Sequence, residues 1–177
     1  MKGENEVKGA FYLLGSLLAL AAGLIFFGTA CETDKKGDNK VSFDKSKETE
    51  EVTKAINNVF GWAVNKDFDL FFSTIADDSD FVSVTPYNRV KFGVEAVKQD
   101  TSFWADARFK AIRHEVHDLK IVFSHSGEVA WFYGLLDDIN EWDGQPANWE
   151  KVRWTGVLEK RDGKWRVVQQ HFSWPKE

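Results

Sequence analysis

The sequence predicts an α+β fold in which three early helices pack on one face of a curved antiparallel sheet. Helical periodicity is confined to residues 46–104, whereas residues 109–174 are rich in β-branched and aromatic side chains separated by turn signals. The apolar fraction of 43% and the aromatic fraction of 15% are enough to form a hydrophobic core. Early helices followed by a run of strands are typical of α+β domains, so we expect one domain over residues 46–177.

Each expected helix has an apolar stripe at three- and four-residue spacing. The first begins at Ser46, the second follows Asp67 as its N-cap, and the third opens at Gly93. Their apolar stripes are Val52, Ile56, Val59, Phe60 and Ala63, then Phe68, Phe71, Phe72 and Ile75, then Val94, Val97, Thr101 and Trp104.

The expected strands are one short segment between the second and third helices and four longer segments after them. The short strand covers Phe81–Val84 and stops at Pro86. The longer strands cover residues 109–123, 128–142, 149–160 and 165–174. Asp162-Gly163 predicts a tight hairpin between the last two strands.

The end of the chain resembles a known family. The loop Ala76-Asp77-Asp78 leads into Phe81-Val82-Ser83, and residues 160–173 read KRDGKWRVVQQHFS. Together with the order of elements, these segments resemble SnoaL-like members of the nuclear transport factor 2-like superfamily over residues 46–175. The resemblance implies a cone-shaped, cystatin-like fold. That superfamily includes steroid isomerases, dehydratases, polyketide cyclases and a kinase association domain, so the fold alone does not give the function.

The first 45 residues differ from the rest in composition. Residues 1–30 are expected to be a signal peptide or a membrane anchor, because an uncharged apolar run extends from Gly9 to Cys31. The length of this run lies between that of a signal-peptide core and that of a spanning helix. Residues 31–45 include the polar stretch ETDKKGDNK at positions 32–40, which predicts a polar tether.

Cys31 is the only cysteine, and it lies where the apolar run meets the polar tether. Gly28-Thr29-Ala30-Cys31 resembles a bacterial lipobox, although Gly28 stands where an aliphatic residue is usual. We therefore expect lipidation at Cys31, attachment to a membrane through that lipid, and a periplasmic or cell-surface location in the bacterial cell envelope.

Charge and spacing argue against two classes of site. The net charge of −5 falls on the folded part of the chain, so we expect no nucleic-acid binding, which needs a basic face. In His114-Glu115-Val116-His117 the two histidines are three residues apart on a strand, and residues three apart point to opposite faces. We expect no metal site and no cofactor.

A regular hairpin at Asp162-Gly163 predicts which side chains share a face. Its cross-strand pairs are Lys160 with Trp165, Leu158 with Val167, Gly156 with Gln169, and Trp154 with His171. This face changes from apolar to polar along the strand, which is typical of a core that ends in a ligand pocket. A one-residue bulge would exchange the faces, and Arg153, Thr155 and Gln170 would then line the cavity.

The expected ligand-binding residues are aromatic, basic or amide side chains on these strands and on the third helix. They are Trp104, His117, Trp131, Tyr133, Arg153, Trp154, Gln169 and His171. His171 is the best catalytic candidate because histidine exchanges protons near neutral pH. In isomerases and dehydratases of the superfamily the base is an Asp or His inside the cone, and no such Asp can be assigned from the sequence.

Three functions therefore remain open. The first is an envelope lipoprotein that binds a small hydrophobic or aromatic molecule in its cone. The second is an acid–base enzyme of the isomerase, dehydratase or cyclase type that uses a pocket histidine. The third is a homodimeric interaction module that pairs through the sheet face opposite the cavity, which the hairpin register above places at Thr155, Val157, Val168, Gln170 and Phe172.

Overall fold

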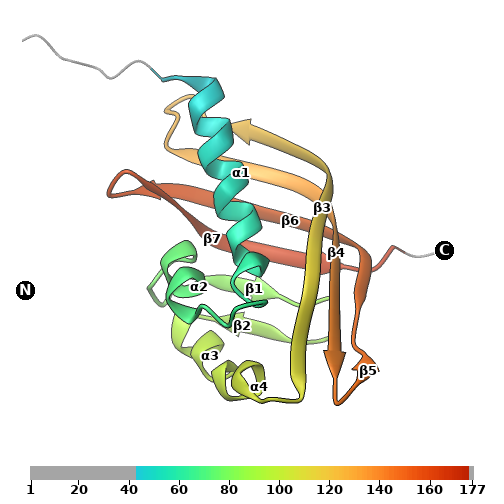
Figure 1. The fold of residues 1–177 in the computed structure, drawn as a ribbon. Helices are drawn as coiled ribbons and strands as arrows, with labels where there is room; N and C mark the ends of the chain where they lie inside the picture. Colours follow the sequence, from blue (N-terminus) through green and yellow to red (C-terminus); the bar gives the residue numbers. More distant parts are fainter. Residues whose placement is uncertain (1–42, 176–177) are drawn as a thin grey trace, which may run out of the picture. The chain divides into compact units, whose positions relative to one another are not determined.

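The computed structural model describes residues 43–175, which form four helices and a seven-stranded sheet (Figure 1). The elements are α1 (Lys45–Gly61), α2 (Phe68–Thr74), β1 (Val82–Val84), β2 (Val90–Phe92), α3 (Val94–Lys98), α4 (Thr101–Ala105), β3 (Phe109–Phe123), β4 (Val129–Trp142), β5 (Gln145–Pro146), β6 (Trp149–Arg161) and β7 (Lys164–Ser173). The predicted signal peptide or anchor and the lipidation at Cys31 lie outside the described residues. Within residues 43–175, no helix is long and apolar enough to cross a membrane.

The helices begin where the sequence places their caps. The carboxylate of Asp44 accepts hydrogen bonds from the backbone N–H groups of Ser46 and Lys47, at 3.0 and 3.2 Å. Asp67 caps α2 through a 2.9 Å hydrogen bond from the N–H of Leu70, as predicted. The expected third helix is instead two short helices, α3 and α4, so the expected number of helices is wrong.

The sheet has the strand order β2-β1-β7-β6-β4-β3, and β5 extends it beside β4. Every pairing is antiparallel except that of β1 with β7, so the sheet is mixed rather than fully antiparallel as expected. The four long strands match their predicted ranges closely, whereas the short strands β2 and β5 were not predicted.

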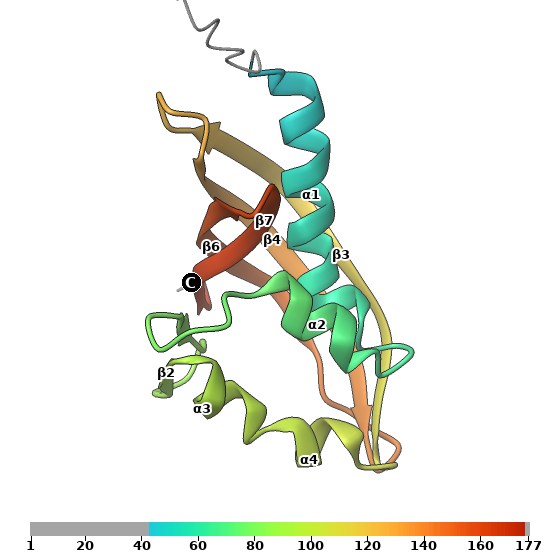
Figure 2. The same cartoon turned by 90° about the vertical axis from the view of Figure 1, so that its left-hand side faces the viewer.

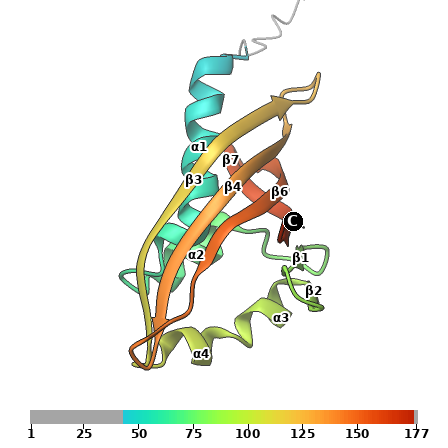
Figure 3. The ribbon, with the colours of Figure 1, turned by 90° about the vertical axis from the view of Figure 1, so that its right-hand side faces the viewer.

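The sheet bends around α1 and α2 (Figures 2 and 3). Four register shifts interrupt the long ladders, and each adds one residue to one strand: Ile112 and Asp118 in β3, Lys151 in β6 and Val168 in β7. Bulges of this kind bend a strand and increase its twist. The sheet thus curves toward α1 and α2. We call the face toward these helices the inner face and the opposite face the outer face.

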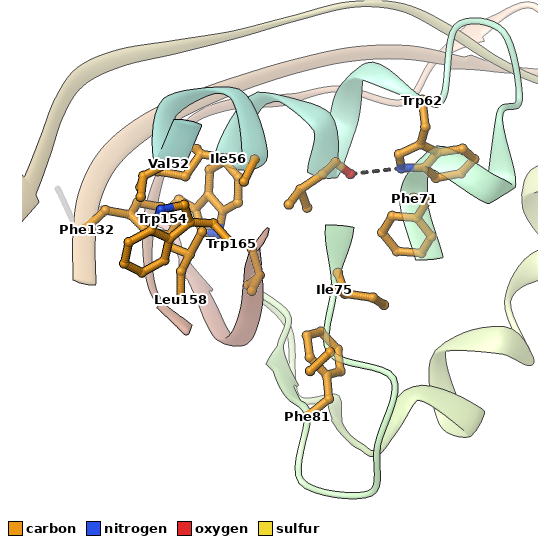
Figure 4. Close-up of a cluster of buried hydrophobic side chains, with 14 of the residues drawn as sticks. Val52, Ile56, Trp62, Phe71, Ile75, Phe81, Phe132, Trp154, Leu158 and Trp165 are labelled. Carbon is orange, nitrogen blue, oxygen red and sulfur yellow. Dashed lines mark hydrogen bonds between the residues drawn. The ribbon is translucent and has the colours of Figure 1, made fainter. Parts of the chain in front are cut away.

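The core lies between α1, α2 and the inner face of the sheet (Figure 4). Val52 and Ile56 of α1 are fully buried, as are Trp154 and Leu158 of β6. Their spacing of four residues on the helix and of four on the strand brings each pair to one face, as the sequence pattern requires. At the other end of the core, the indole N–H of Trp62 donates to the carbonyl of Val59 at 2.8 Å, which satisfies a buried donor.

Candidate acid–base site on the inner face of the sheet

The β6–β7 hairpin keeps its predicted register only near the turn. Leu158 pairs with Val167 as expected, but Val157 then pairs with Gln169 and Trp154 with Phe172. The extra residue, Val168, exchanges the two faces of β7 beyond that point, so the regular register is wrong there. Gln170 and Phe172 consequently lie on the inner face and are buried, whereas His171 is exposed on the outer face.

The bulge exchanges the faces of β7 but not those of β6. Arg153 and Thr155 stay on the outer face and are exposed, so they do not line the interior as the bulged alternative predicted. Arg153 instead donates a 2.7 Å hydrogen bond to the carbonyl of Trp174. Phe172 and Gln170 are likewise removed from the face that we expected to pair with a second copy.

Three of the predicted pocket residues meet on the outer face. Trp131, Tyr133 and Gln169 line a shallow groove of about 490 Å³ together with Lys120, Val122, Thr155 and Val157. The exposed fractions of Val122, Trp131 and Tyr133 are 46%, 46% and 40%. This groove lies on the face opposite the helices, not inside the cone.

The remaining predicted residues lie apart from one another. His117 is on the outer face, where its Nε2 lies 3.1 Å from a carboxylate oxygen of Asp137. Trp104 packs in an aromatic cluster with Trp62 and Phe71, at ring-centroid distances of 5.3 and 5.4 Å. Of the eight predicted pocket residues, Trp154 is the one that is fully buried on the inner face.

The inner face of β4 carries a polar pair that the sequence analysis missed. Every second residue of this strand faces the core: Ala130, Phe132, Gly134, Leu136, Asp138 and Asn140. The first four are apolar or Gly, and the last two introduce a carboxyl group and an amide. A polar pair at the end of an apolar row on one face is a signal that alternation alone could have revealed.

Asp138 and Asn140 are hydrogen-bonded to each other. The side-chain amide of Asn140 donates to a carboxylate oxygen of Asp138 at 2.8 Å. Asn140 is only 6% exposed, and its side-chain oxygen has no hydrogen-bond partner among the described residues. Burial raises the pKa of Asp138 to about 6, and the hydrogen bond from Asn140 opposes this rise without cancelling it. This carboxyl group therefore exchanges a proton near neutral pH.

His114 lies directly across the sheet from Asp138, since the two residues are partners in the β3–β4 ladder. Its ring is on the inner face, 6.4 Å from the ring of Phe60 of α1 between centroids. Burial lowers the pKa of His114, so the neutral imidazole is favoured. A second titratable group thus lies beside the carboxyl group.

Aromatic side chains lie on the inner face near this polar pair. Trp149 is the partner of Asp138 in the β4–β6 ladder, and its ring lies 5.3 Å from that of Phe172 and 6.3 Å from that of Tyr87. Phe60 packs edge-on against Trp154 at 5.2 Å. The inner face therefore combines apolar side chains with a few polar groups, a composition that is common in small-molecule sites.

Comparison with known families agrees with this architecture. A family model described as a SnoaL-like domain matches residues 52–177, so the chain belongs to the SnoaL-like domain family. The resemblance noted at the sequence level is thereby confirmed, as is the nuclear transport factor 2-like fold. No match was found among curated proteins.

Solved structures show the same fold at low sequence identity. A provisionally assigned scytalone dehydratase from Novosphingobium aromaticivorans is 13% identical, with a TM-score of 0.63, covering 72% of this chain and 83% of its own. A nuclear transport factor 2-like protein from Prochlorococcus is 19% identical, with a TM-score of 0.57, covering 73% and 94%. A protein with a cystatin-like fold from Nostoc punctiforme is 16% identical, with a TM-score of 0.55, covering 71% and 89%. At these identities the likeness shows the fold alone.

Proposed function

We propose that the domain binds a small molecule against the inner face of its sheet and that Asp138 exchanges a proton with that molecule. The observation that carries this proposal is the hydrogen-bonded pair of Asp138 and Asn140 opposite His114, on the face of the sheet that the helices cover. Burial there raises the pKa of Asp138 to about 6. General acid–base catalysis is most effective when the pKa of the catalytic group lies near the working pH. Pairs of perturbed titratable groups also concentrate at functional sites.

The neighbouring residues fit this role. The amide N–H of Asn140 donates to one oxygen of Asp138, and the side-chain oxygen of Asn140, which has no partner within residues 43–175, can accept a hydrogen bond from a ligand. His114, opposite Asp138, is favoured in the neutral form and can donate or accept one hydrogen bond. Asp138 and His114 thus replace His171 as the acid–base candidates, because His171 faces outward.

The test uses proton exchange, which needs no knowledge of the natural substrate. The full chain is incubated in D₂O with a panel of cyclic and aromatic ketones, and NMR follows deuterium incorporation next to the carbonyl. We expect exchange with at least one ketone, with a rate that increases between pH 5 and 7 as Asp138 ionises.

Asp138→Asn should abolish this exchange, whereas Glu141→Gln should retain it. Glu141 is a matched control because it removes a carboxylate from the outer face of the same strand. The proposal fails if the wild-type protein catalyses deuterium exchange in none of the ketones and none of them raises its melting temperature. It also fails if the Asp138→Asn variant catalyses the exchange as fast as wild type.

We also propose that the domain is tethered to a membrane of the bacterial cell envelope through lipid at Cys31. The support is the position of this residue between an apolar run and a polar segment. Cys31→Ala should prevent fatty-acid incorporation and release the protein from the membrane fraction. Unchanged fractionation and size, with no fatty acid in the wild-type protein, would refute this tethering.

A second function, homodimerisation through the outer face of the sheet, is favoured by the groove on that face. Val122 and Trp131 are direct cross-strand partners, as are Trp131 and Val157, so half-exposed apolar side chains form a continuous row. Such a row is suited to isologous packing against a second copy. The chain lacking residues 1–42 should sediment as a dimer at micromolar concentration, and Trp131→Lys should sediment as a folded monomer. A wild-type monomer at high micromolar concentration would rule this out.

A further inference from the structure

We propose that Asp137, on the outer face, is a positioning residue for the inner-face site. It stabilises a bulge in β6, and this bulge places Trp149 opposite Asp138. This inference rests on the proposed acid–base role of Asp138 and adds to it a requirement for one particular backbone conformation. Asp137 itself does not reach the inner face.

The register of the β4–β6 ladder shows what the bulge does. Leu136 pairs with Val152, and Asp138 pairs with Trp149, so two steps along β4 oppose three along β6. In a regular ladder the partner of Asp138 would be Glu150, whose side chain would share its face. The bulge therefore replaces a carboxylate with an indole ring opposite Asp138, while Glu150 turns outward and is exposed.

Asp137 accepts the hydrogen bond that holds this bulge. One oxygen of its carboxylate accepts the backbone N–H of Lys151 at 2.7 Å, and the other lies 3.1 Å from Nε2 of His117. Lys151 has a φ of 52°, in the left-handed region that residues other than glycine rarely adopt. The carboxylate therefore stabilises a backbone conformation that Lys151 would not favour by itself.

The position of Trp149 determines the environment of Asp138. The indole packs against Phe172 and Tyr87, and its residue is the cross-strand partner of Asp138, so an apolar ring neighbours Asp138 on the inner face. His114 faces Asp138 from β3, and Asn140 is its hydrogen-bond partner on β4. Burial is the main cause of the raised pKa of Asp138, and we expect the ring that the bulge places opposite it to contribute to that burial.

The experiment measures the titration midpoint of the Asp138 carboxyl carbon by NMR in the full chain. All variants carry Glu150→Gln. If β6 loses its bulge, residue 150 moves opposite Asp138, and a second carboxylate there would raise the midpoint of Asp138. With this substitution the loss of the bulge is expected only to lower the midpoint. In this parent we expect a midpoint near 6. Asp137→Ala should lower the midpoint by about one pH unit or more, because water and the polar side chain at position 150 replace the displaced indole.

Two further variants separate positioning from charge and from general stability. Asp137→Asn removes the charge but keeps an oxygen for the N–H of Lys151, so the midpoint should stay within about 0.3 of the parent's value. Lys151→Gly added to Asp137→Ala should restore the parent's midpoint, because glycine adopts a positive φ without help. A variant that merely unfolds is recognised separately by far-UV circular dichroism.

Each outcome decides between the two proposals. A parent midpoint near 4 removes the basis of the acid–base function itself. A raised parent midpoint that Asp137→Ala leaves unchanged refutes the positioning role alone. If Asp137→Ala does not fold, the double variant decides: folding with the parent's midpoint supports the inference. Folding with a midpoint near 4, or failure to fold, overturns it.

Discussion

Replacing Asp138 with Asn should stabilise the protein, and the gain should depend on pH. In the folded state burial raises the pKa of this carboxyl group from 3.8 to about 6. Each unit of difference between folded and unfolded pKa corresponds to about 1.4 kcal/mol. Above pH 6 the folded state therefore carries a penalty of about 3 kcal/mol for holding the ionised carboxylate.

The sign follows from proton binding. Between pH 4 and 6 the folded state binds more protons at Asp138 than the unfolded state does, so the penalty grows as the pH rises. From these pKa values it is about 0.5 kcal/mol at pH 4 and about 3 kcal/mol at pH 7. Asparagine cannot ionise and keeps a similar shape, so it removes the penalty at every pH.

Urea unfolding of both proteins at pH 4, 5, 6, 7 and 8 measures this difference. We expect Asp138→Asn to exceed wild type by a few kcal/mol at pH 7 and 8 and to match it closely at pH 4. Glu141→Gln, on the outer face of the same strand, controls for the loss of one negative charge. A destabilised Asp138→Asn variant at pH 7, or a gain that does not change with pH, would refute the reasoning.

Three other substitutions test the core and its ties to the sheet. Trp154→Ala removes a fully buried ring and should cost about 4 kcal/mol of unfolding free energy in urea titrations; a loss below about 1 kcal/mol would contradict the burial. Burial raises the pKa of Glu48, but hydrogen bonds from two donors on the β6–β7 hairpin outweigh it and hold that pKa below its ordinary value. Glu48→Gln should therefore lower the free energy of unfolding by about 1 to 3 kcal/mol at pH 7. Near pH 3 the loss should be much smaller, because protonation of Glu48 has already removed this stabilisation from wild type. An equal loss at both pH values would count against this reasoning. Gly156→Ala places a Cβ 2.6 Å from the ring of Phe132 and 2.8 Å from the carbonyl oxygen of Gln169. Because these distances are shorter than van der Waals contact, the melting temperature should fall by several degrees. An unchanged melting temperature would show that the strands can separate there.

The sequence predicted the elements well because their signals are local. Asp67 directly precedes the apolar stripe of α2 and caps this helix through the N–H of Leu70, three residues later. A helix cap therefore involves only residues that are close together in the sequence. The division of the third helix into α3 and α4 near Asp100 was not predicted, because the apolar stripe continues across the break. The strand β2 was also missed, since three residues carry too little periodicity to identify.

The candidate site was harder to predict because bulges exchange the faces of strands. One extra residue at Val168 moved His171 from the expected interior to the outer face. The same register shift brought Gln170 into the core. Asp138 could have been found from the alternation along β4, but nothing local shows that burial raises its pKa.

The sequence by itself determined the family, the order of helices and long strands, the tight turn at Asp162-Gly163 and the apolar character of the core. The family rests on the resemblance of residues 76–83 and 160–173, and the turn rests on the dipeptide Asp162-Gly163. The elements and the core depend on composition and on periodicities of 3.6 and 2 residues, which each segment carries alone. Only the tertiary structure decided which side chains face the helices, because the bulges at Lys151 and Val168 arise from pairing between distant strands. The pKa of Asp138 was decided there too, since desolvation depends on every element packed around the carboxyl group.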